Sequence, residues 1–150
     1  MAIQQLQMVF RLEQEKEDKL AREFQQAQQN LEENKQKMTG IETYRMDYLR
    51  QMQQKGNEGV TIDSYGHFQA FVTKLEEAIK QQSTVISTAF QVVTQRKNLW
   101  LEQQRKRKAV EMLIDKHHAS VRAKADKAEQ ALLDEVATQR FFRQRDARQR

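Results

Sequence analysis

The chain contains no proline and no cysteine, and only four of its 150 residues are glycine. Without cysteine, neither disulfide bonds nor thiolate metal sites can form, and a reducing compartment is permitted. The absence of proline removes the strongest helix breaker. No stretch approaches the roughly 20 apolar residues of a membrane span. The first residues lack the basic region and apolar core of a signal peptide. We expect a protein that is soluble and intracellular or docked on a larger assembly, and that is not inserted in a membrane.

The residues that are abundant, Gln, Glu, Lys, Arg, Ala and Leu, lose little side-chain freedom in a helix and favour long helices. The apolar fraction is 38% and the charged fraction 31%, which is too few apolar residues for a thick globular core. The net charge of +5 is uneven: it is 0 over residues 1–55, −2 over 56–95 and +7 over 96–150. Any acidic partner is therefore expected to meet the C-terminal third first.

Three of the four glycines fall in the stretch GNEGVTIDSYGHF, residues 56–68, which predicts a turn between two helices. Gly56 and Gly59 can take the positive φ that ends a helix. Asp63 or Ser64 is the expected N-cap of the next helix. We predict one domain over residues 1–150, with helix 1 at about 3–55, a turn at 56–64, helix 2 at 65–142 and a basic tail at 143–150.

Apolar residues recur at every seventh position along the first predicted helix. One column is Ile3, Phe10, Glu17, Phe24, Leu31, Met38, Arg45 and Met52. The other is Leu6, Glu13, Leu20, Ala27, Asn34, Ile41 and Tyr48. Eleven of these fifteen positions are apolar, and the spacing is typical of the narrow seam of a coiled coil.

The second predicted helix repeats the pattern. Its first column is Val72, Ile79, Ile86, Val93, Trp100, Arg107, Ile114, Val121, Ala128, Glu135 and Phe142. The partner column, Leu75, Ala89, Val110 and Ala131, is interrupted by Gln82, Arg96, Gln103, His117, Lys124 and Thr138. The stripe is widened near the turn by Phe68, Phe71, Ala78, Val85 and Val92. The apolar stripe therefore thins towards the C-terminus.

Folding the chain at residue 60 brings the apolar positions of the two helices opposite one another. The opposed pairs are Ile41 with Ile79, Leu31 with Ala89, Leu20 with Trp100, Phe10 with Val110 and Leu6 with Ile114. The polar interruptions also coincide, since Glu13 falls opposite Arg107 and Glu17 opposite Gln103. A charged pair within a seam fixes register more than it adds stability.

This match favours an antiparallel two-helix coiled coil, a helical hairpin, over a parallel dimeric rod. Ile3 then pairs near His117, so residues from about 118 onward overhang without a partner in the chain. Their weak apolar stripe is Val121, Ala125, Ala128, Leu132, Val136, Phe141 and Phe142. A lone helix of this kind is marginal in water, and another protein could complete it.

No catalytic, metal or cofactor site is expected. His117 and His118 are adjacent, so they diverge on a helix and do not share a metal ion. The glycines lie in a polar turn, which is not the context of a phosphate-binding loop. A two-helix coiled coil offers no buried pocket for catalytic groups. We read the chain as a non-enzyme without cofactors.

The four consecutive cations of QRKRKA, residues 104–109, suggest nucleic-acid binding as an alternative. A basic-zipper protein places such a run at one end of its heptads, whereas here heptads lie on both sides. Successive helical residues point about 100° apart, so the run encircles the helix. We interpret it as a solvated collar, with Arg107 turned towards Glu13.

Three stretches together carry a family resemblance. TYRMDYL (43–49) spaces two tyrosines by one turn, YGHFQAFVTKLEEAIKQQ (65–82) opens the second helix, and LLDEVATQRF (132–141) lies in the overhang. The Phe-x-x-x-Leu-x-x-Ala-Ile stretch and the later Glu-x-Ala-x-x-Arg add to the likeness. Over nearly the whole chain, this set resembles the FliJ family of flagellar export proteins.

The resemblance implies a soluble stalk of the flagellar type III export apparatus, at the cytoplasmic face of the inner membrane. Its implied partners are the hexameric export ATPase, the cytoplasmic part of the export gate protein and export chaperones, without nucleic acid or membrane insertion. The implied gate-facing residues are Ile41, Tyr44, Tyr48, Phe71, Leu75 and Ala78. Of these, we expect Ile41, Tyr48 and Leu75 to serve mainly in the seam. Tyr44 and Phe71 lie further from the seam, and we expect them to form an exposed aromatic pair that contacts the partner. At the patch edges, Lys37 and Gln82 depart from the family pattern.

For the ATPase ring, we expect contacts from Arg140, Phe141, Phe142 and Arg143 in the arginine-rich end of the chain. Two alternatives remain open at this point. One is a basic coiled-coil adaptor that binds nucleic acid or acidic scaffold proteins. The other is the equivalent stalk of a virulence-type secretion system.

Overall fold

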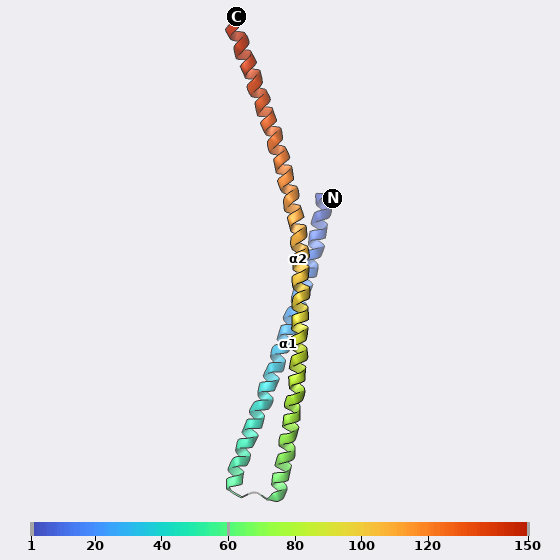
Figure 1. Ribbon diagram of the computed structural model, residues 1–150, viewed down its shortest axis with the longest axis vertical. Coiled ribbons are helices and arrows are strands. Elements are labelled where there is room, and N and C mark those ends of the chain that lie inside the picture. Colours follow the sequence, from blue (N-terminus) through green and yellow to red (C-terminus); the bar gives the residue numbers. More distant parts are fainter. Residues whose placement is uncertain (1, 60, 150) are drawn as a thin grey trace. The chain divides into compact units, whose positions relative to one another are not determined.

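The computed structural model describes residues 2–59 and 61–149, which form two helices, α1 (Ile3–Asn57) and α2 (Ile62–Gln149), and no strands. The chain divides into two compact units: residues 16–104, and residues 1–15 together with 105–150. In each unit a segment of α1 packs antiparallel to a segment of α2 (Figure 1). The predicted all-α class and antiparallel coiled-coil pairing are confirmed.

Both helices are longer than predicted. α2 starts three residues before the expected position and continues to Gln149, through the stretch expected to be a separate basic tail. The arginines of that stretch are good helix formers. Arg148 lies in the last turn, where a positive charge interacts favourably with the helix dipole.

The cap of α2 is Thr61, and the expectation of Asp63 or Ser64 is wrong. The Ser64 backbone N–H donates to the Thr61 hydroxyl oxygen at 3.3 Å, and the Thr61 hydroxyl donates to the Ser64 side chain at 2.9 Å. A hydroxyl that accepts from the third helical N–H is the usual N-cap arrangement. Asp63 lies inside the first turn, where its charge suits the positive end of the helix dipole.

The end of α1 depends on glycine at one position. Gly59 has φ = +93°, whereas Gly56 stays helical and no described non-glycine residue has a positive φ. The Glu58 N–H donates to the Lys55 carbonyl at 3.1 Å and the Gly59 N–H to the Gly56 carbonyl at 3.3 Å. These hydrogen bonds join residues three apart, as in a 3₁₀-helix, and tighten the last turn. The chain then reverses direction at Gly59.

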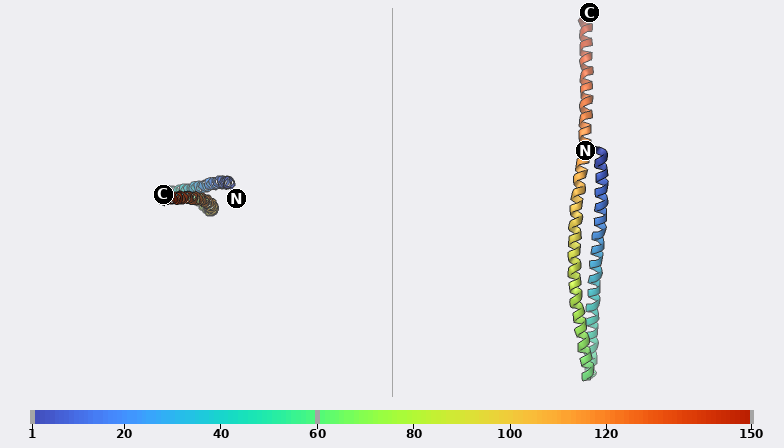
Figure 2. Two further views of the ribbon diagram at one scale, coloured as in Figure 1. Left: turned by 90° about the horizontal axis from the view of Figure 1, so that it is seen from above. Right: turned by 90° about the vertical axis from the view of Figure 1, so that its right-hand side faces the viewer.

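In the unit of residues 16–104, the seam follows the predicted columns. Every α1 column member from Glu17 to Met52, and every α2 column member from Val72 to Gln103, is buried or half-buried. Leu31 and Ala89, which were predicted to face each other, are 9% and 6% exposed. Figure 2 shows α1 beside α2 in this unit. The core of this unit is a single row of side chains between the two helices, so the stabilising contacts are distributed along the length of the unit.

Contacts between the helices of this unit give the register. Arg45 bonds Glu76 at 3.3 Å, and Arg96 bonds Glu23 at 3.4 Å. In each pair the two residues are nearly the same number of positions from the turn, as the predicted fold-back at residue 60 requires. The Trp100 ring stacks on Phe24 with centroids 5.7 Å apart, one helical turn from the predicted neighbour Leu20.

In the other unit, residues 3–15 pack along the α2 segment that begins at residue 105. Leu6 is buried, and Ile3, Phe10, Glu13, Arg107, Val110, Ile114 and His117 are half-buried. From residue 118 to 149 every side chain is exposed, and no second helix accompanies this stretch within the unit (Figure 2). The seam therefore ends at His117, and the predicted overhang of the second helix is confirmed.

Candidate functional site

An aromatic cluster lies near the turn end of the 16–104 unit. The ring of Tyr48 packs against Phe71 at 4.6 Å and stacks on Phe68 at 5.2 Å between centroids. Tyr44 meets the Phe71 ring edge-on at 6.0 Å, and Tyr65 lies 6.4 Å from Phe68. Aromatic pairs at these distances add about 0.5–1.5 kcal/mol beyond the burial of their area. The cluster therefore joins the two helices and leaves ring faces at the surface.

The six residues expected at the export gate differ in exposure. Tyr44 is 54% exposed. Ile41, Tyr48, Phe71, Leu75 and Ala78 are half-buried. Half-burial of Ile41, Tyr48 and Leu75 fits their expected role in the seam. Phe71 is more enclosed than expected, because both Tyr44 and Tyr48 pack against it. Tyr44 is thus the member whose ring is freest to contact another protein.

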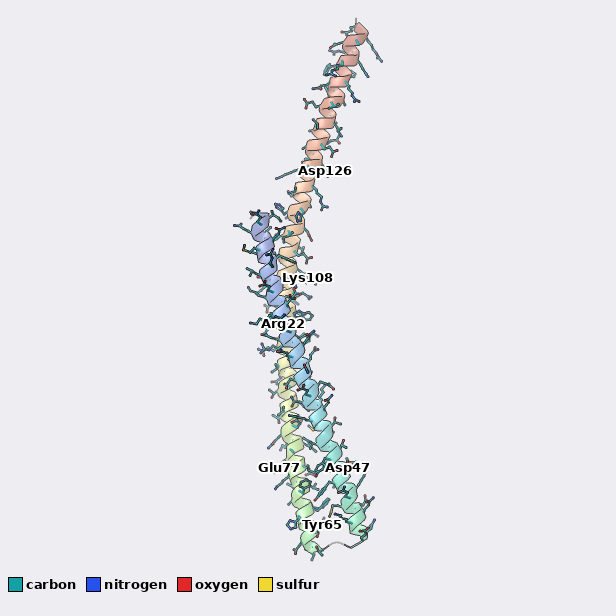
Figure 3. All side chains as sticks on the ribbon, turned by 180° about the vertical axis from the view of Figure 1, so that it is seen from behind. Arg22, Asp47, Tyr65, Glu77, Lys108 and Asp126 are labelled. Atoms are coloured by element: carbon teal, nitrogen blue, oxygen red, sulfur yellow. The ribbon has the colours of Figure 1, made fainter. Side chains whose placement is uncertain are left out.

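Sequence reasoning did not include Phe68 and Tyr65 in this surface. Tyr65, labelled in Figure 3 beside the turn, is 56% exposed. Its hydroxyl accepts a hydrogen bond from Gln69 at 2.9 Å. With Phe68, Leu49 and Met52, Tyr65 lines a shallow, largely apolar groove. The sequence spacing could have placed Phe68 in this surface, because Phe68 lies three residues before Phe71 and therefore on the same side of α2.

The second candidate surface is the exposed segment 118–149 of α2, here called the tail. Phe141 is 62% and Phe142 45% exposed, with ring centroids 5.8 Å apart and ring planes 71° from parallel. The Arg145 guanidinium lies over the Phe142 ring at 4.9 Å, which is a cation–π contact. Arg140 and Arg143 are also exposed. The four predicted ring-contact residues are therefore all exposed, and they are distributed around one turn of the tail helix.

The basic run at 105–108 does not gather on one side of the helix. Arg107 is half-buried, and its guanidinium donates to Glu111 one turn further along α2 at 2.6 Å. Arg105, Lys106 and Lys108 are exposed. This arrangement favours a solvated collar over a nucleic-acid-binding stripe. The pairing of Arg107 with Glu13, which is half-buried in the same unit, remains a prediction.

Residues 2–59 and 61–149 contain neither a candidate membrane span nor a candidate metal site. Neither helix has a stretch long and apolar enough to cross a membrane. In the same residues, no group of three or more His, Asp or Glu side chains is placed to hold a metal ion. The rings of His117 and His118 are 6.0 Å apart and nearly perpendicular.

Two long helices pair antiparallel through a seam in which apolar residues recur at every seventh position, and exposed aromatic groups lie near the turn and on the tail. These features define a coiled-coil hairpin protein. The family model of the flagellar FliJ protein matches residues 1–146, and the chain belongs to this family. It is therefore a component of the flagellar type III export system, in a family without catalytic activity. Neither the curated proteins nor the solved structures gave a match.

Proposed function

We propose that the chain is a stalk of the export apparatus that binds the hexameric export ATPase through its tail and stimulates it. The observation that carries this proposal is the exposure of every residue from 118 to 149, including both phenylalanines. Phe141 and Phe142 supply apolar anchors, and Arg140 and Arg143 supply charge for an electronegative lining. ATP hydrolysis is the work of the partner.

The proposed mechanism follows from symmetry. A single helix has a different side chain in each radial direction, so it cannot contact six identical subunits in the same way. The ring subunits in contact with the phenylalanines and arginines would be held in a different state from the others. An asymmetric contact of this kind can favour one subunit for hydrolysis over its neighbours.

The surface near the turn is proposed to bind the cytoplasmic part of the export gate protein. Tyr44 is its exposed anchor, and Phe71 supports the Tyr44 ring from the opposite helix. Exposed aromatic residues on a firmly packed base are the groups most often found at the energetic centres of interfaces. Handling of export chaperones, and a position at the cytoplasmic face of the inner membrane through these partners, belong to the same proposal.

The test is a pull-down of the export ATPase with the full chain, followed by an ATPase assay. Replacing Phe141 and Phe142 by alanine should weaken ATPase binding by about thirtyfold or more, because even one interface anchor is worth about 2 kcal/mol. Arg140→Ala with Arg143→Ala should also weaken binding. The matched control is Arg105→Ala with Lys106→Ala, which removes the same charge from exposed positions outside the tail.

Circular dichroism should show unchanged helix content in all of these variants, because every substituted side chain is exposed. Full stimulation of the ATPase by the folded double-phenylalanine variant would refute the ring contact. An equal loss in the Arg105/Lys106 control would mean that net charge, and not the tail surface, governs the interaction.

A further inference from the structure

The tail carries an apolar face that no other part of its unit covers. The face lies on one side of the helix, because its residues have the spacing i, i+3, i+4 and i+8: Leu133, Val136, Ala137 and Phe141. Leu133 is 56% exposed, Val136 40% and Phe141 62%. Together with Arg140 and Gln144 these residues line a shallow open groove. Helices in proteins gain most of their stability from packing of an apolar face, so covering this face would stabilise the segment.

Acidic and basic residues occupy different halves of the segment that carries this face. Residues 128–135 carry Glu129, Asp134 and Glu135 and no base. Residues 136–149 carry Arg140, Arg143, Arg145 and Arg148 against a single acid, Asp146. The segment is therefore negative before Ala137 and positive after it. A segment with this polarity is complementary to itself when it is reversed.

We propose that the tail face binds the tail of a second copy of this chain, antiparallel and centred near Ala137. The two-fold relation places Leu133 against Phe141 of the second copy, and the reverse contact follows by symmetry. Ala137, which is small, lies where the two backbones approach each other. The acidic stretch of each copy then lies along the basic stretch of the other. Glu129 comes within a helical turn of Arg143 and Arg145 of the second copy.

The charge pattern determines both the orientation and the kind of partner. A parallel pair would align arginines with arginines and acids with acids, and like charges in register are repulsive. An anionic lipid surface would attract the arginines and take up Phe141. It would repel Glu129, which lies one turn before Leu133 on the same side of the helix, and Asp134, which lies beside that side. A second copy of the tail, in contrast, places basic residues along the acidic half of the segment and acidic residues along its basic half.

This self-association is distinct from the proposed binding to the ATPase and does not depend on it. It covers Phe141, which the ring contact also uses, so the two interactions exclude each other. A chain paired through its tail would therefore be held away from the ring until the partner competes for Phe141.

Charge exchange tests the proposal. In one variant of the full chain Glu129, Asp134 and Glu135 become lysine, and in another Arg140, Arg143 and Arg145 become glutamate. Sedimentation equilibrium at low salt should show concentration-dependent dimerisation of the native chain. Each variant alone should remain monomeric, and their equimolar mixture should form heterodimers. Circular dichroism establishes that both variants keep their helices.

A second measurement uses the natural absence of cysteine. Under mild oxidation, Ala137→Cys should form disulfide-linked dimers about tenfold faster than Ser120→Cys, because residue 137 lies on the two-fold axis. Phe141→Ala should weaken dimerisation about tenfold. Phe90→Ala, at a position 60% exposed in the other unit, should leave dimerisation unchanged.

The proposal is overturned if the native chain stays monomeric at several hundred micromolar, or if the two cysteine variants cross-link equally fast. It is also overturned if the mixed charge variants fail to associate. A chain that binds phosphatidylserine vesicles and remains monomeric in solution would assign the tail face to lipid. None of these outcomes bears on ATPase stimulation, which is measured separately.

Discussion

The side-chain amide of Gln82 in α2 donates hydrogen bonds across the helix pair to Asn34 in α1. Its nitrogen lies 2.9 Å from the Asn34 backbone carbonyl and 3.1 Å from the Asn34 side-chain oxygen. Both residues occupy seam columns, where each was expected to be a polar interruption. They form a polar layer within the apolar seam, and such a layer specifies register at some cost in stability.

Gln82→Ala should lower the free energy of unfolding by about 1 kcal/mol, because the hydrogen bonds to Asn34 are lost. Replacing Asn34 and Gln82 together by leucine should raise it by about 1–2 kcal/mol, since apolar side chains then fill the layer. Urea unfolding followed by circular dichroism measures both. Gln81→Ala, at the exposed neighbouring position, is the control and should change little.

The leucine pair should also loosen the register. Spin labels at the exposed positions Gln28 and Thr88 should give one narrow distance in the native sequence and a broader distribution in the double-leucine variant. A distribution of unchanged width would show that the apolar layers fix the register without the polar one.

The stacking of Phe24 on Trp100 gives a direct optical probe, because Trp100 is the only tryptophan. Phe24→Ala should destabilise the helix pair by about 2–3 kcal/mol through lost burial and stacking. Tryptophan emission should shift to the red as water reaches the indole. Phe90→Ala removes a ring that is 60% exposed and should leave both stability and emission almost unchanged. Equal effects of the two substitutions would contradict the observed packing.

Two glycines near the turn should respond in opposite directions to alanine. Gly59→Ala should cost about 1–2 kcal/mol, because φ = +93° is unfavourable for a residue with a Cβ atom. Gly66→Ala should stabilise by about 0.5–1 kcal/mol, since Gly66 lies within α2 and an added Cβ would meet nothing within 4 Å. Thermal unfolding of the two single variants measures the difference. A stabilising Gly59→Ala would mean that the turn adopts another conformation.

Tyr44→Ala should weaken binding to the cytoplasmic domain of the export gate by about tenfold, with little loss of helix-pair stability because the ring is 54% exposed. Tyr65→Ala is the matched control: it is 56% exposed and contacts the same aromatic cluster, but it lies outside the predicted gate surface. Surface plasmon resonance with immobilised gate domain compares them. A larger effect of Tyr65→Ala would move the contact towards the turn.

Much of the fold could be predicted because a seven-residue period directly specifies which side of a helix is buried. The columns through Leu31 and Ala89 were placed correctly, and so was the end of the seam at His117. The cap at Thr61 was missed because several hydroxyl and carboxylate side chains lie close together in the turn. Which of them caps the helix depends on the path of the backbone.

For the candidate surfaces, the sequence identified the aromatic residues but not their contacts. Tyr44 and Phe71 were both expected to be open, and the structure shows Phe71 packed between two tyrosines while Tyr44 remains exposed. The tail residues Phe141 and Phe142 were placed on an unpartnered stripe, and they are exposed. Arg145 over the Phe142 ring could not be predicted, because side-chain rotamers decide that contact.

The sequence by itself determined two long helices, one turn, an antiparallel seam and an uncovered C-terminal segment, because helix propensity and hydrophobic period are local properties. The tertiary structure decided which polar side chains meet, as Asn34 and Gln82 do, and which aromatic ring of a cluster stays at the surface. These outcomes depend on distances between residues remote in the chain. Several registers one turn apart satisfy the same period, and packing selects among them.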